Sequence, residues 1–139
     1  MARYINNETG GKERNRLTKG IVISIRELMK QQKPDNTSRD LAAFIAVALL
    51  QVHATIDESV AAWEKKDYWV KADRYRRDWE WTLSMGNKMK QAVLQEDWAT
   101  IAITSAQIAQ KLNTIKVSDK HRLGTPWVGA LALLKEQFN

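Results

Sequence analysis

Apolar residues recur at three- and four-residue spacing along almost the whole chain, and runs of strict alternation at period two are missing. The first pattern places apolar side chains on one face of a helix, whereas the second would place them on one face of a strand. The sequence therefore predicts an all-α fold. We expect a compact bundle of about five helices, with a core like that of a four-helix bundle and long antiparallel second and third helices.

Breaker residues and capping residues between the apolar stripes set the expected helix boundaries. The first helix should cover about Lys12 to Gln32, because Pro34 disfavours the α conformation in the residue before it. Thr37 or Ser38 then supplies an N-cap hydroxyl, and Asp40 is placed to meet the positive end of the second helix. The later helices are expected from there to Lys65, over Tyr68–Leu94, over Asp97–Leu112, and from Thr125 as N-cap with Pro126 in the first helical position.

The second helix is apolar on nearly all sides of its first half. Its apolar segment, Leu41 to Ile56, is interrupted by Gln51 and His53 and is shorter than the roughly 20 residues of a membrane-spanning helix. Such a helix is central in a bundle or shared with a second chain. We therefore expect a homo-oligomer, most simply a two-fold dimer, and no membrane partner. The predicted core consists of Leu41, Ile45, Val52, Ile56, Trp63, Tyr75, Trp79, Leu83, Ile101, Ile108 and Leu131.

Residues 67–81, DYWVKADRYRRDWEW, combine aromatic and charged side chains in a way that fits either a binding surface or a helix of the core. On a helical wheel Tyr75 and Trp79 fall on the core face, while Trp69 and Trp81 fall on its flanks. The charges form i, i+4 pairs and sum to zero, whereas a groove that follows phosphates needs excess positive charge. We interpret the stretch as an amphipathic helix, with Trp69 and Trp81 as candidate interface aromatics. The alternative is a binding surface that combines these two tryptophans with Arg74 and Arg77.

The formal net charge of +6 is concentrated at the two ends of the chain. Residues 1–39 carry nine Lys or Arg against four Asp or Glu, and residues 111–139 carry five against two. Five cations of the first helix share one face, opposite its apolar stripe, and the segment near His121 adds two more. This surface is a candidate for docking on an acidic protein or on a nucleic-acid backbone, and the alternative is a solvated helix face. The candidate residues are Lys12, Arg16, Lys19, Arg26, Lys30, Lys120 and Arg122.

The sequence excludes several kinds of chemistry. It has no cysteine, which rules out disulfides, thiolate metal sites and cysteine nucleophiles and is compatible with a reducing cytoplasm. It has no phosphate-binding glycine motif and no zinc-protease motif. His53 is interpreted as bonded to its helix neighbours, with Asp57 four residues on, and His121 lies in a basic loop without the convergent partners of a triad. We expect no metal, no cofactor and no catalytic residues.

We therefore expect a single domain over residues 1–139, with a flexible arm over 1–11 and an irregular loop over 113–124. The N-terminus has no secretory pattern, which favours a cytoplasmic location. The leading hypothesis is a non-enzymatic interaction or assembly protein, a small subunit or adaptor that self-associates and docks on an acidic partner. One alternative is a nucleic-acid-associated subunit that contacts phosphates without reading bases. Another is a bundle that binds a small ligand between its second and third helices, beside Tyr68, Tyr75 and Trp79.

Overall fold

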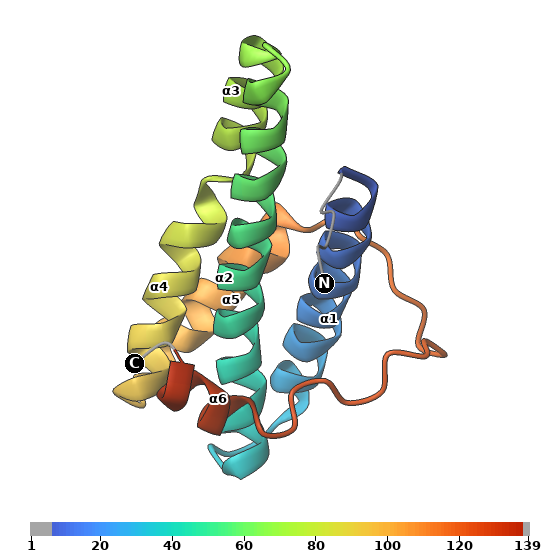
Figure 1. Ribbon diagram of the computed structural model, residues 1–139. Coiled ribbons are helices and arrows are strands. Elements are labelled where there is room, and N and C mark those ends of the chain that lie inside the picture. The colour runs from blue at the N-terminus through green and yellow to red at the C-terminus, as the bar shows by residue number, and fades with distance from the viewer. Residues whose placement is uncertain (1–6, 138–139) are drawn as a thin grey trace.

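The computed structural model describes residues 7–137, with side chains from residue 10 onward, and every regular element in that range is a helix. Helix α2 stands at the centre of the molecule, with α1 on one side and α3 and α4 running back along the other (Figure 1). The predicted all-α bundle is confirmed. The helices are α1 (Asn7–Lys30), α2 (Asn36–Lys65), α3 (Trp69–Trp79), α4 (Trp81–Leu94), α5 (Trp98–Lys111) and α6 (Ala130–Gln137).

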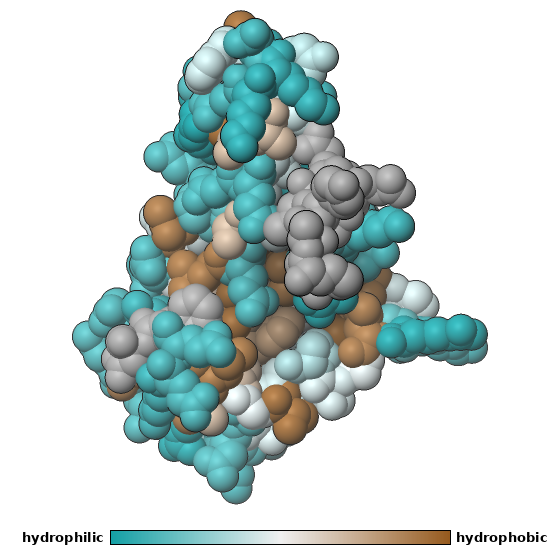
Figure 2. Space-filling model, viewed as in Figure 1, coloured by the Kyte–Doolittle hydropathy of each residue, from teal (hydrophilic) through white to brown (hydrophobic). Residues whose placement is uncertain are grey.

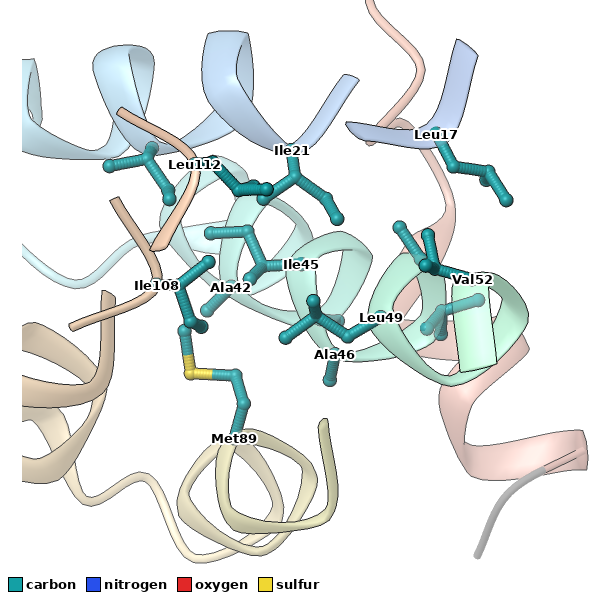
Figure 3. Packing of buried hydrophobic residues seen from close by; sticks show 14 of the residues in the cluster. Leu17, Ile21, Ala42, Ile45, Ala46, Leu49, Val52, Met89, Ile108 and Leu112 are labelled. Atoms are coloured by element: carbon teal, nitrogen blue, oxygen red, sulfur yellow. The ribbon is translucent and has the colours of Figure 1, made fainter. Parts of the chain in front are cut away.

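The core lies where α1, α2, α4 and α5 meet (Figure 3), and α2 supplies more of it than any other helix. By length and composition α2 would pass as a membrane span, but 56% of its most apolar window is buried against the rest of this chain. We expected a dimer because α2 has apolar residues on nearly all sides. Within one molecule, α1, α3, α4 and α6 all pack against α2. Self-association itself stays a prediction.

Helix α1 begins at Asn7, five residues before the predicted start at Lys12, and ends at Lys30. The predicted flexible arm therefore overlaps the helix over residues 7–11, and its first six residues lie outside the described part of the chain. Gly20 does not interrupt α1. A Cβ at this position would lie 3.0 Å from Phe44 Cζ, so the glycine lets α1 approach α2 closely.

The predicted third helix is two helices, α3 and α4, that meet at Glu80. At this point the hydroxyl of Thr82 donates a hydrogen bond to the carbonyl of Trp79 at 2.7 Å. The amide of Leu83 donates to the carbonyl of Glu80 at 3.2 Å. After this break between the two helices, Thr82 is buried, whereas Leu83 is 40% exposed. The prediction that Leu83 belongs to the core is therefore wrong.

Three other predicted core residues, Tyr75, Trp79 and Leu131, are only partly buried, although all three pack against the core. The remaining seven are buried as predicted. Tyr75 and Trp79 therefore cover the core from outside rather than filling it.

Capping differs from the sequence-based expectation at two helices. The N-cap of α2 is Asp35, whose carboxylate accepts from the amide of Ser38 at 2.9 Å. Helix α6 begins at Ala130, later than Thr125 and Pro126 predict, after a turn with Gly129 at φ +82°. The carboxylate of Asp40 contacts α6 and is not the N-cap of α2, the helix in which it lies. It accepts from the amides of Gly129 at 3.2 Å and Leu131 at 3.0 Å and so holds the start of α6 against α2.

Candidate interaction surfaces

An aromatic ladder joins α2, α3 and α4. The ring centroids of Trp63 and Tyr75 lie 4.9 Å apart in an edge-on arrangement, and Tyr75 is followed by Trp79 at 6.3 Å. Trp79 and Trp81 stack with 6.3 Å between centroids and 21° between planes. Trp81, a candidate interface aromatic, is therefore a partly buried member of this ladder. Lys71 lies over the Trp63 ring, with its Nζ 4.6 Å from the centroid.

Arg14 is a buried cation beside this ladder. Its Nη1 donates to Thr55 Oγ1 at 3.2 Å and to Ser59 Oγ at 3.3 Å, both on α2. Across the part of the chain that the structure describes, no carboxylate pairs with it. Burial raises the pKa of the Tyr75 phenol, and the nearby Arg14 partly offsets that rise. Arg14 was absent from the predicted basic face, yet it lies three residues before Leu17, on the apolar stripe itself.

The predicted basic face of α1 is largely paired with acids. Arg16 pairs with Glu13, which raises the pKa of Arg16, and Lys30 pairs with Glu27 at 3.3 Å. Lys12 and Lys19 are exposed at the surface. Arg16 and Lys30 thus pair with acids on their own helix, and Arg26 pairs with the loop that follows α5.

Arg26 joins α1 to the loop over residues 112–129. Its Nη1 lies 3.1 Å from Asp119 Oδ1, and its Nη2 donates to the carbonyl of Val117 at 2.8 Å. The side chain is only partly exposed, contrary to the expectation that it faces solvent. Lys120 and Arg122 follow Asp119 in this loop and are exposed. Lys12 lies about 21 Å from Arg26 along the helix, at 1.5 Å per residue, so the cations form a long row and not one compact patch.

Trp69, the other candidate interface aromatic, stands at the exposed end of the α2–α3 hairpin. It is 58% exposed, and its neighbours Tyr68 and Val70 are 54% and 74% exposed. In Figure 2 the upper end of the molecule is mostly hydrophilic, with pale side chains at its edges and a small apolar area at the top. We call these three residues the aromatic tip.

A groove runs between the C-terminal half of α1 and the length of α5. It consists of two adjoining cavities of about 290 and 410 Å³ that share Leu28 and Ala102. We call it the α1–α5 groove. Its other lining residues are Ile25, Met29, Gln31, Gln32, Lys33, Pro34, Ser38, Trp98, Ile101, Ser105, Ala106, Ala109 and Gln110.

The groove is lined mainly by apolar side chains, and those on α5 are mostly alanines, which leave the helix backbone near the surface. Ala102, Ala106 and Ala109 are exposed along one face of α5, and Met29 on the opposite wall is 81% exposed. The hydroxyl of Ser105 is buried at the groove, without a hydrogen-bond partner. Ile101, Ser105 and Ile108 form the buried stripe of α5, which does not include these alanines. Alanines at i, i+4 and i+7 were the available signal, although the groove depends on α1, which is distant in sequence.

Other predicted groups do not assemble into a site. His53 Nε2 lies 3.3 Å from Asp57 Oδ2, which confirms the predicted contact with a helix neighbour, while its Nδ1 is buried without a partner. Residues 7–137 contain no group of three or more metal-ligating side chains. Tyr68, Tyr75 and Trp79 line three different surface depressions.

Comparison of the chain with protein-family models, with curated proteins and with solved structures gave no match. Function is therefore inferred from the geometry of these surfaces alone.

Proposed function

We propose that this chain is a non-enzymatic helical interaction protein that binds an amphipathic helix of an acidic partner in the α1–α5 groove. The observation that carries the proposal is the groove itself, a long apolar channel between two helices. From Trp98 to Gln110 it extends about 18 Å at 1.5 Å per residue, which is three turns of a partner helix. Grooves of this kind accept an apolar helix face at i, i+3, i+4 and i+7 spacing.

The side chains along the groove suit a partner helix. Alanines on α5 allow a second backbone to approach closely, and Met29 can adjust to the shape of an apolar side chain. Met29 is 81% exposed, and exposed apolar surface at a groove is of a kind that marks interaction sites.

Charge favours an acidic partner. The lining residues include Lys33 and no Asp or Glu, and the chain as a whole carries +6. Complementary charge raises the association rate and selects among partners of similar shape. For the same reason a second copy of this chain is a poorer occupant, because two copies at +6 repel each other.

The alternative of binding a nucleic-acid backbone has less support. Arg16, Lys30 and Arg26 are paired with carboxylates, so contact with phosphates would have to displace those pairs. The alternative of a small ligand between the second and third helices also has less support, because the rings of Tyr75 and Trp79 pack against each other.

The test uses two labelled peptides of about 18 residues, long enough to form a helix, with one apolar face in common. Glu occupies the outer positions of one peptide and Lys those of the other. The acidic peptide should bind by fluorescence anisotropy, more weakly at high salt, and the basic peptide should not. Ala106→Glu should abolish binding, whereas Ala61→Glu, at an exposed alanine of α2, should leave it unchanged. Equal binding by both variants would refute the proposal.

A further inference from the structure

The aromatic tip is held in place by the backbone, not by its own side chains. Asp67 adopts a left-handed conformation at φ 62°, and the amide of Tyr68 donates to the carbonyl of Trp63 at 2.9 Å. These two features reverse the chain within a few residues. Trp63 and Ala72 pack inward on either side of the turn, so Tyr68, Trp69 and Val70 are left outside.

The hairpin projects from the body of the molecule. Helix α3 packs mainly on α2, and the end of the hairpin extends beyond both α1 and α4 (Figure 1). The tip can therefore touch a flat surface before any other part of residues 7–137 reaches it. A convex projection of this kind suits a flat or yielding partner better than it suits a rigid groove.

Cations surround the exposed aromatic residues. Lys65 and Lys66 precede the tip, Lys71 follows it, and Asp67 is the one acid within residues 65–71. All of these residues are exposed. Tryptophan and tyrosine favour the interface between water and lipid, and clustered lysines are attracted to anionic headgroups.

We propose that the aromatic tip docks peripherally on an anionic lipid surface. Trp69, Tyr68 and Val70 enter the headgroup region, while Lys65 and Lys66 lie against anionic headgroups. Helix α2 does not cross the bilayer in this arrangement, because it remains the centre of the bundle. The expectation of no membrane partner considered only a spanning segment, and this proposal departs from it. It is independent of the α1–α5 groove.

The test is sedimentation of the full chain with vesicles of phosphatidylcholine, with and without phosphatidylglycerol. The protein should sediment with the anionic vesicles only, and less at high salt. Lys65→Gln with Lys66→Gln should lower the partition coefficient by about fivefold for each lysine. Trp69→Ala with Val70→Ser should also lower it. The matched control, Met29→Ser with Ile103→Ser, removes equally exposed apolar side chains from elsewhere and should have no effect.

A second measurement places the tip within the lipid. Brominated lipid should quench part of the tryptophan fluorescence of the bound wild type. Trp69→Phe keeps an aromatic anchor, so it should still bind but lose most of that quenching. Circular dichroism confirms that each variant is folded.

Failure to sediment with anionic vesicles overturns the proposal. So does binding that the tip variants leave unchanged, or that the Met29 and Ile103 control weakens to the same extent. If the protein sediments equally with neutral vesicles, the lysines do not contribute to binding, and the proposal is overturned.

Discussion

The guanidinium of Arg14 lies over the ring of Tyr75, with 5.2 Å between Cζ and the ring centroid. The contact joins α1 to α3, and the hydrogen bonds from the same guanidinium to Thr55 and Ser59 join both helices to α2. Gly10 leaves room for this arrangement, since a Cβ there would lie 3.3 Å from Ser59 Oγ. One buried cation thus ties three helices together.

Replacement of Arg14 tests this link. Lysine keeps the charge but loses the planar fork that reaches two hydroxyls and an aromatic face at once. The lost hydrogen bonds and cation–π contact predict that Arg14→Lys lowers the free energy of unfolding by about 1–3 kcal/mol. Urea denaturation followed by circular dichroism measures this change.

The matched control is Arg16→Lys, two residues along the same helix. Arg16 is exposed and pairs only with Glu13, so the change should stay within about 0.5 kcal/mol. If both substitutions cost the same, Arg14 does not hold the three helices together.

Two glycines in helices should respond to alanine with opposite signs. At Gly86 a Cβ would lie 3.0 Å from Leu50 Cδ2 and 3.3 Å from Leu49 Cβ. The Leu50 side chain can rotate away, but Leu49 Cβ is fixed to the backbone of α2. The cost of overpacking, about 1–3 kcal/mol, should exceed the gain in helix propensity of about 1 kcal/mol. Gly86→Ala should therefore be about 1 kcal/mol less stable than wild type.

Gly11 is the comparison, because among the described side chains a Cβ there meets only Arg14 Nη2, at 4.0 Å. Gly11→Ala should be more stable than wild type by about 0.5–1 kcal/mol in the same urea experiment. A gain at Gly86 as large as that at Gly11 would show that α4 can move away from α2.

Local signals in the sequence were enough to predict the fold class and several helix boundaries. Helix α2 ends at Lys65 as expected, and α5 is capped by Asp97, the residue at which the helix was expected to begin. The break at Glu80 could not be predicted in this way. Residues 76–85 contain neither Gly nor Pro, so no breaker residue marks it.

The candidate surfaces were harder to predict from the sequence than the fold was. The wheel placed Trp69 at the margin of its helix, and the structure exposes it. Arg14 was missed because arginine was assumed to be a surface residue. The α1–α5 groove was missed because its two walls are some 75 residues apart in the chain, and no local pattern reports the gap between them.

Asp40 should control the order of α6. Its two carboxylate oxygens accept from Leu131 and Gly129, some 90 residues away in sequence. Asp40→Ala leaves both amides without these acceptors and should lower stability by about 1 kcal/mol, as loss of an N-cap does. Amide hydrogen exchange over Ala130–Gln137 should accelerate more than exchange in the middle of α2.

Asp40→Asn provides a graded comparison, because asparagine has one acceptor oxygen where aspartate uses two. The stability of Asp40→Asn should lie between those of wild type and Asp40→Ala. Uniform acceleration throughout the chain would contradict a local role for Asp40.

The N-cap of α5 should make stability depend on pH in the acid range. Hydrogen bonds from the hydroxyl and amide of Thr100, at 2.7 and 3.1 Å, lower the pKa of the Asp97 carboxyl. A carboxyl whose pKa is lower in the folded state stabilises that state fully above its unfolded pKa of about 3.9, and the contribution is lost as pH falls through the folded pKa. Asp97→Asn should therefore lower Tm at neutral pH and flatten the fall in Tm below about pH 4.

Thr100→Val isolates the cause, because it removes the hydroxyl donor and keeps the backbone amide. The pKa of Asp97, followed by carbon NMR of the carboxyl, should rise toward its ordinary value, since the hydroxyl makes the largest contribution to the shift. The acid dependence of Tm should weaken in parallel, because linkage ties the loss of stability to the difference between the folded and unfolded pKa. A pKa unchanged by Thr100→Val would assign the shift to the backbone amide and the helix dipole instead.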